Sequence, residues 1–164
     1  MKQLLYPLLL FSFILLGGFR PGEQKALPIW QFGERVIEDG FPASANPLWA
    51  RLRQCQVNYD ETERLYKISL VADVRALEAQ TVRASGFMLP LDESDKTKHF
   101  LLTRRAPLCR SCEAPGTPNE ALEVRTTEPV DWTADIIAIK GRFKLINDGR
   151  NGFFFALLDA ETAS

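Results

Sequence analysis

Hydrophobic and polar residues alternate most regularly near the end of the chain, in residues 137–145. Apolar side chains occupy every second position there apart from Gly141, and the positions between them are small or basic. This period of two predicts a β-strand with one buried face. Gly141 takes a position on the apolar face, where the missing side chain lets the strand coil sharply, as small barrels require.

Residues 153–160 follow after two turn signals in residues 147–152, and they are apolar on both faces. This predicts a strand that is central or covered. Four other stretches also show strand patterns. In one of them, residues 81–91, Gly86 predicts a bulge or sharp bend and Pro90 predicts the end of the strand. The others are residues 64–71, 99–103 and 121–126, with a short helix over 72–79 and a helical turn over 48–54.

Two stretches lack a clear period. Residues 28–53 hold four aromatic residues among prolines and glycines, so we interpret them as an irregular lead-in that lays aromatic side chains on the core. Residues 104–121 form a connection of about eighteen residues, and loops of that length are more often functional or stapled. Together the short strands predict a mainly β fold, a small OB-like β-barrel with one short helix; a small β-sandwich is the alternative.

The length of 164 residues suits one domain, which we place at residues 28–160. The beginning of the chain predicts an export signal, because Lys2 precedes an uncharged apolar run that is short for a membrane-spanning helix. We expect a signal peptide over 1–20, with no defined cleavage site, and a linker over 21–27; an uncleaved membrane anchor is the alternative. The expected location is therefore periplasmic or secreted.

The balance of charge bears on the class of partner. The formal net charge is −1, and removal of residues 1–20 would leave 18 basic and 21 acidic residues. A protein that binds nucleic acid needs a positive surface for the phosphates. This balance and the predicted export therefore argue against DNA or RNA as a partner.

Cys109 and Cys112 lie two residues apart in the long loop, with prolines on both sides. Three interpretations of this pair stay open. Outside the cytosol a close pair is a disulfide by default, although so small a ring removes little chain entropy. The pair could instead be half of a zinc site. Thiol chemistry is the third interpretation, but the prolines after the pair leave no helix of the kind that a thioredoxin-like site uses.

A metal site would need further ligands, and His99 is the single imidazole of the chain. Cys109, Cys112 and His99 are therefore the candidate metal ligands, with zinc as the candidate cofactor. A histidine at the start of a strand is more often solvated or hydrogen-bonded than a ligand. For the third cysteine, Cys55, burial among apolar residues is favoured over pairing with another chain.

The sequence has no constellation typical of an enzyme. No G-x-S-x-G elbow occurs, and the glycines of residues 147–152 belong to a hairpin turn rather than a phosphate-binding loop. The acidic residues of 92–95 lack the spacing of a calcium site. Short basic runs at 51–53 and 104–105 are interpreted as solvated surface. We therefore expect a protein without enzymatic activity.

Several motifs follow one another in a distinctive order between residues 67 and 158. A strand with a G-F-x-x-P-L pattern leads to a hydrophobic strand, then to the cysteine-bearing loop with a Pro-Asn pair, and then to another strand. The residues that carry these motifs are Gly86, Phe87, Pro90, Leu91, Pro118, Asn119, Leu122 and Val124.

In this order of motifs the chain resembles the bacterial exported proteins grouped as domain of unknown function 3299. Many members of that family carry a Cys-x-His pair where this chain has Cys109 and Cys112, and both are pairs of soft-metal ligands. The resemblance implies no particular reaction. It implies a place beside an ABC transporter, which in some cases is linked to zinc.

Three functions follow as hypotheses. The favoured one is an exported non-enzymatic accessory or binding module, associated with ABC transporter components or another envelope protein, whose Cys109–Cys112 loop contacts the partner or zinc. The second is a periplasmic thiol–disulfide redox protein. The third is a structural secreted domain whose loop is stapled by a disulfide. Contact with the membrane is expected only if the signal stays uncleaved.

Overall fold

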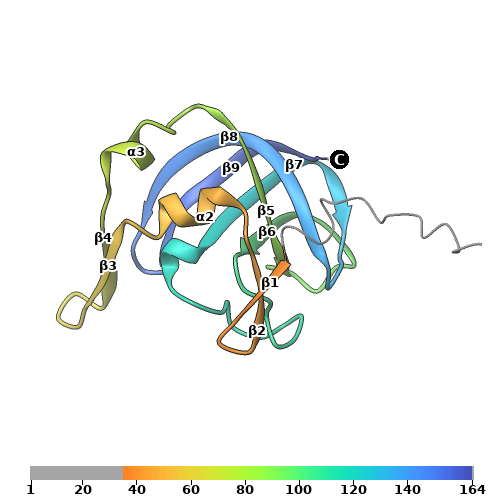
Figure 1. Cartoon of the computed structure of the whole chain (residues 1–164), viewed down its shortest axis with the longest axis horizontal. Helices are drawn as coiled ribbons and strands as arrows, with labels where there is room; N and C mark the ends of the chain where they lie inside the picture. The colour runs from red at the N-terminus through yellow and green to blue at the C-terminus, as the bar shows by residue number, and fades with distance from the viewer. Residues whose placement is uncertain (1–34, 164) are drawn as a thin grey trace, which may run out of the picture.

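The computed structural model describes residues 35–163. Strands make up most of this part of the chain, with short helices between them (Figure 1). The predicted signal peptide, the linker and the first part of the lead-in lie outside the described residues. In chain order the elements are β1 (Arg35–Glu38), β2 (Phe41–Ser44), α2 (Pro47–Leu52), β3 (Gln56–Asp60), β4 (Leu65–Ser69), α3 (Ala72–Arg75), β5 (Thr81–Pro90), β6 (Lys96–Thr103), the 3₁₀ helix η1 (Pro118–Glu120), β7 (Ala121–Asp131), β8 (Ile136–Asp148) and β9 (Phe153–Thr162).

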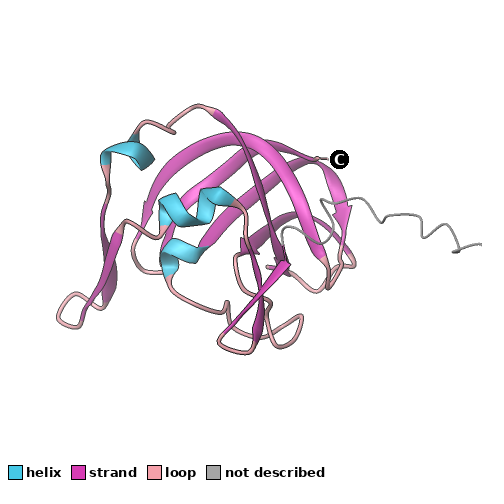
Figure 2. Cartoon of the chain, viewed as in Figure 1, coloured by secondary structure: helices cyan, strands magenta, loops and turns pink. Residues whose placement is uncertain are grey.

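The strands β5 to β9 pair into one sheet whose order is closed (Figure 2). β5 pairs with β6 and with β8, β6 pairs with β7, and β9 lies between β7 and β8. These pairs are antiparallel except for β7 with β9, which run parallel. Each of the five strands thus has a partner on both sides. The mainly β fold class is confirmed.

The core is built largely by β8 and β9. Residues 154–157 of β9 are buried on both faces, as their apolar pattern predicted. On β8, Ile139 and Phe143 are fully buried, with Gly141 between them. The register between β8 and β9 shifts at Gly141, and a Cβ at this residue would come 2.9 Å from the Cβ of Ala160. The glycine therefore allows the two strands to approach each other where the pairing is irregular.

Gly86 in β5 serves a different purpose from the predicted bulge. Its pairing with Ile137 of β8 continues the register of its neighbours without a shift, so the predicted bulge is wrong, while the alternative of a sharp bend stays a prediction. A Cβ at Gly86 would lie 2.5 Å from the carbonyl oxygen of Thr103 and 3.2 Å from the ring of Trp49. Glycine is needed because two other elements approach the backbone closely. The predicted end of the strand at Pro90 is confirmed.

The irregular lead-in predicted over 28–53 is wrong within its described part, because β1 and β2 form a hairpin there. Asp39 and Gly40 join the two strands with φ angles of +51° and +83°. A two-residue hairpin turn needs positive φ at these positions, and Asp-Gly is one of its commonest sequences. β3, which pairs with β4 in a second hairpin, is also absent from the predicted elements. Its residues are mostly polar, so no apolar alternation marks it.

The short helix α2 confirms the helical turn predicted over 48–54. Asn46 caps it, since its side chain accepts a hydrogen bond from the backbone N–H of Leu48 at 3.0 Å, and Pro47 follows at the start of the helix. The helix places Trp49 in the core. The Trp49 indole Nε1 donates to the carbonyl oxygen of Ser85 in β5 at 2.7 Å. This bond attaches the helix to the closed sheet.

Candidate functional site

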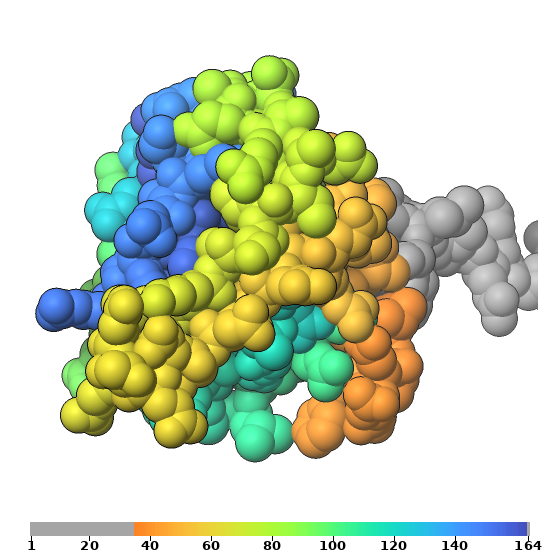
Figure 3. Space-filling model, turned by 90° about the vertical axis from the view of Figure 1, so that its left-hand side faces the viewer, coloured from red at the N-terminus to blue at the C-terminus, as the bar shows by residue number. Residues whose placement is uncertain are grey.

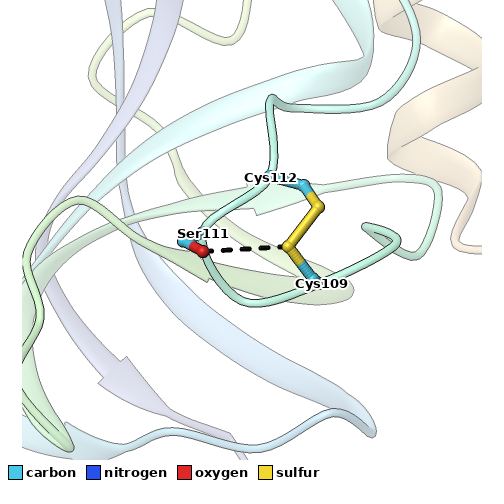
Figure 4. The surroundings of a disulfide bond; sticks show 3 residues. All are labelled: Cys109, Ser111 and Cys112. Carbon is cyan, nitrogen blue, oxygen red and sulfur yellow. Dashed lines mark hydrogen bonds between the residues drawn. A yellow bond between two sulfur atoms is a disulfide. The ribbon is translucent and has the colours of Figure 1, made fainter.

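The long loop between β6 and β7 carries a disulfide between Cys109 and Cys112 (Figure 4). Their Cα atoms are 5.1 Å apart, and the Cys112 backbone N–H donates to the Cys109 carbonyl at 3.3 Å. Ser111 Oγ lies 3.8 Å from Cys109 Sγ. Of the three interpretations of the pair, the structure therefore agrees with the disulfide. Residues 113–117, between Cys112 and η1, are irregular, so no helix begins at the pair.

His99, the third predicted metal ligand, does not join the two cysteines. It sits on β6, where its Nε2 is 2.7 Å from Glu123 Oε1 on β7, and Arg125 donates to the same oxygen at 2.8 Å. Among residues 35–163, no three His, Cys, Asp or Glu side chains gather as a metal site. Cys109, Cys112 and His99 therefore do not form the predicted set of metal ligands. A cysteine binds zinc as a thiolate, and here the sulfurs of Cys109 and Cys112 are bonded to each other.

Cys55 is buried and free, as expected from its preferred interpretation. Its carbonyl oxygen accepts a hydrogen bond from the side-chain Nδ2 of Asn119 at 2.8 Å. Asn119 lies in η1 at the end of the long loop and is itself buried. This bond fixes the end of the loop to the segment after α2, and Pro118 begins η1. These two motif residues thus have a structural role.

The two ends of the loop are held by a buried ion pair. Arg104 Nη1 donates to Glu120 Oε1 at 3.0 Å, and its backbone N–H donates to the Glu120 carbonyl at 2.9 Å. Arg104 also binds the carboxylate of Glu38 in β1, and Arg53 lies 3.2 Å from Glu120 Oε1. Arg104 is only 6% exposed, so its interpretation as solvated surface is wrong. The Arg104 hydrogen bond is the main cause that lowers the pKa of Glu38.

The loop also lies against the first hairpin. The Ala106 backbone N–H donates to the carbonyl oxygen of Pro42 in β2 at 2.9 Å, and Ala43 forms a bridge with Arg105. Figure 3 shows the hairpin in orange and the loop in green side by side on one face of the molecule. The hairpin therefore supports the first part of the loop up to the disulfide.

Arg110, between the two cysteines, attaches the middle of the loop to the closed sheet. Its Nη1 donates to Asp95 Oδ1 at 2.6 Å, and its Nη2 donates to the backbone carbonyls of Glu93 and Ser94. The guanidinium lies over the ring of Trp132, 5.3 Å from the ring centroid. Such cation–π contacts are favourable where the ring is partly shielded from water. Arg110, a residue of the C-x-x-C motif itself, thus fixes the position of the loop that carries the disulfide.

A cavity of about 170 Å³ lies between this loop and the closed sheet. Most of its lining is apolar, and Leu108, which belongs to the lining, is 82% exposed and lies at the mouth. The Trp132 indole Nε1 is shielded from solvent and has no hydrogen-bond acceptor among residues 35–163. The lining comprises Phe87 and Met88 of β5, residues 106–110 of the loop and residues 132–134 after β7.

A second, wider hollow of about 470 Å³ begins on the other side of Arg110. Pro90 and Leu91 form its apolar part, and Asp92 and Glu93 form its acidic part. The hydrogen bond from the Thr97 hydroxyl is the main cause that lowers the pKa of Asp92, and the backbone N–H of Ser94 adds to it. Asp92 is therefore a carboxylate at neutral pH. Ser111 completes the lining.

Sequence reasoning located the loop and its cysteines but missed Trp132 and the anchoring role of Arg110. Trp132 follows the last residue of β7, where no periodic pattern continues. The only signal for it was a large aromatic residue between a strand and a turn. Arg110 could have been noticed as the one charged residue inside the C-x-x-C motif, but its partners come from the turn between β5 and β6.

No family model, curated protein or solved structure matches this chain. Within residues 35–163, no helix has the length and apolar character needed to cross a membrane.

Proposed function

We propose that the chain is an exported binding module without enzymatic activity, and that its disulfide loop contacts a protein of the cell envelope. The observation that carries this proposal is the apolar cavity beneath the loop, with Leu108 exposed at its mouth. Leu108 extends the apolar lining of the cavity to the surface, and a contiguous apolar patch marks a contact surface. The export expected from residues 1–20 and the resemblance to an exported family support the location, and the resemblance favours an ABC transporter component as partner.

The fold part of the proposal is an OB-like barrel. The closed order β5-β6-β7-β9-β8, with its parallel pair between β7 and β9, supports this assignment. Barrels of this kind present their binding surfaces on loops around one region of the sheet. The loop between β6 and β7 takes that role here.

A photo-crosslinking amino acid at position 108, introduced in the producing cell, tests the proposed contact. Tyr59, which is 50% exposed on β3, provides the matched control position. We expect a discrete adduct with an envelope protein from position 108 and none from position 59. The variant Ala106→Phe, which adds a side chain to the cavity lining, should remove the adduct. Equal adducts from both positions, or none from position 108, would contradict the proposal.

Thiol–disulfide exchange is a second candidate function, favoured by the exposure of Cys109. A partner's thiolate would attack Cys109 Sγ, and Cys112 would leave as a thiolate, so that a mixed disulfide forms with no net oxidation. A second attack within the partner would then reduce this chain and oxidise the partner's thiol pair. Titration of the reduced protein tests the idea, because a Cys109 thiol pKa near the unperturbed value of about 8.5 would argue against it.

Zinc belongs to the proposal only through the resemblance. The described residues do not fit a resident zinc site, because a reduced Cys109–Cys112 pair would supply two ligands and the rest would have to come from a partner. Zinc titration of the reduced protein, with Cys109→Ser/Cys112→Ser as the control, should show binding no tighter than in the control. Tight binding that depends on the two cysteines would restore the metal hypothesis.

A further inference from the structure

We infer that the segment bound by the loop is an extended peptide in which an apolar side chain is followed, within one or two residues, by a basic one. This inference rests on the proposed function and names the chemistry of the partner. It is carried by two adjoining hollows of different character that share Arg110 as a common wall.

The first hollow selects an apolar side chain. Its volume of about 170 Å³ is mostly bounded by apolar groups from β5, the loop and the segment after β7. An apolar protein cavity of about 150 Å³ can accept a molecule as large as benzene. One leucine or phenylalanine side chain therefore suits the space. Leu108 at the mouth would lose its exposure to water when such a residue binds, which adds apolar contact.

The second hollow selects a basic side chain. Asp92 and Glu93 contribute two carboxylates, while the single guanidinium in the lining, Arg110, already donates to Asp95 at 2.6 Å. Arg110 also acts electrostatically on Asp92, but the two carboxylates of the lining outnumber its one guanidinium, so the hollow presents net negative charge toward a ligand. Leu91, which is 42% exposed, can cover the aliphatic part of a lysine or arginine while the cationic end reaches the carboxylates.

The adjacency of the two hollows sets the spacing of the peptide. Arg110 lines both of them, so the two hollows adjoin at its side chain and a bound chain can reach both. An extended chain advances about 3.3 Å per residue and points successive side chains to opposite sides. The apolar and basic residues are therefore expected to be one or two positions apart.

The Trp132 indole provides a reporter inside the site. Its Nε1–H lacks an acceptor among the described residues and is shielded from solvent. Trp132 lines the cavity, so a side chain that enters it alters the surroundings of the indole proton. Trp49, whose indole already donates to Ser85, should not respond.

The test is an NMR titration of the full mature protein with the blocked hexapeptide Gly-Ser-Leu-Lys-Lys-Gly. Two control peptides replace Leu by Ser or both Lys by Glu. We expect the first peptide to shift the Trp132 indole signal and the amides of residues 91–93 and 106–111. Each control should bind at least about fivefold more weakly.

The variant Glu93→Gln should reduce the preference for lysine over glutamate, while Glu61→Gln in the exposed turn between β3 and β4 should leave it unchanged. Equal binding of the Lys and Glu peptides, shifts confined to other faces, or no binding of any peptide would overturn the inference. Self-association of the chain through Leu108, seen by sedimentation, would also overturn it in favour of a second copy. If the peptide test fails but position 108 still gives an adduct in cells, the inference about the peptide fails and the proposed function stands. If position 108 gives no adduct, both the inference and the proposed function fail.

Discussion

The surroundings of Trp49 and Trp132 show how differently the molecule uses the same side chain. Trp49 is 1% exposed, and its indole donates to the Ser85 carbonyl, which also accepts from the Ser44 hydroxyl at 2.7 Å. Asn46 Nδ2 donates to the Ser85 hydroxyl at 3.1 Å. The indole of Trp132 has no such partner within residues 35–163, and its ring lies beside a cavity under Arg110.

The two regions therefore differ in whether folding gives every buried polar group a hydrogen-bond partner. Buried polar groups are nearly always hydrogen-bonded, because an unpaired donor costs about 1–3 kcal/mol. The Trp49 region meets that requirement with its own residues. The Trp132 region does not, and it adjoins an exposed leucine and an exposed disulfide. The first region therefore serves stability, and the second is where we place the contact with a partner.

Trp49→Ala should have the largest effect on stability. It removes a fully buried ring and its bond to Ser85, so the free energy of unfolding should fall by about 3–5 kcal/mol. Urea unfolding followed by circular dichroism measures the loss. The control Tyr59→Ala removes a half-exposed aromatic residue and should cost less than about 1 kcal/mol. Similar losses for both variants would show that the Trp49 region is not the completed core described here.

Gly86→Ala should come next, since it acts on the same region through the backbone. The added methyl group would lie 2.5 Å from the Thr103 carbonyl oxygen and close to Trp49, so β5 must shift. We expect a loss of about 1–3 kcal/mol by the same measurement. Lys140→Ala, at an exposed position of β8, should stay within about 0.5 kcal/mol of the wild type. A tolerated Gly86→Ala would mean that β5 and β6 are less closely packed than the structure shows.

The double variant Cys109→Ser/Cys112→Ser should have a smaller effect. The bond closes so short a ring that its removal should lower the free energy of unfolding by at most about 2 kcal/mol. In thermal melting, the variant and the reduced wild type should show the same small decrease in melting temperature relative to the oxidised wild type. A loss of about 4 kcal/mol or more would show that the fold depends on the disulfide.

Trp132→Phe should have the smallest effect on the free energy of unfolding, and the sign of the change should be opposite to that of Trp49→Phe. The change removes a buried N–H without an acceptor, so stability should stay the same or rise by up to about 1 kcal/mol. Trp49→Phe removes a satisfied N–H and should lower stability by about 1 kcal/mol. Parallel urea curves compare the two. If Trp132→Phe is the more damaging change, the indole has a structural partner, and the contrast between the two regions fails.

The sequence predicted the elements that have a strong period and missed those formed by other means. β8 was predicted from the alternation of apolar and polar residues, and β9 from a run that is apolar on both faces. Both patterns arise because the buried faces of a strand require apolar side chains at a fixed spacing. β1 and β2 depend on the positive φ angles of Asp39 and Gly40, a signal of two residues that the surrounding prolines and aromatics obscured. β3 is held by pairing with β4 rather than by a buried face of its own.

The candidate site was predictable to a similar degree. The position of the loop and the pairing of Cys109 with Cys112 follow from length and from proximity in the chain. The burial of Arg104 could not be predicted, because it depends on Glu120 and Glu38, which lie 16 and 66 positions away. The place of Trp132 beneath the loop depends likewise on tertiary packing. His99 was a reasonable metal ligand by residue type, but the nearest acidic partner on the adjacent strand is Glu123.

The position of β9 between β7 and β8 has a consequence for the order of events during synthesis. β7 and β8 cannot complete their pairing until residues 153–162 are available, so a nascent chain that ends earlier leaves two strand edges unpaired. The sheet therefore cannot close before residues 153–162 have been synthesised. Until then β7 and β8 each expose an edge that can pair with another chain, so β9 protects the molecule against edge-to-edge association.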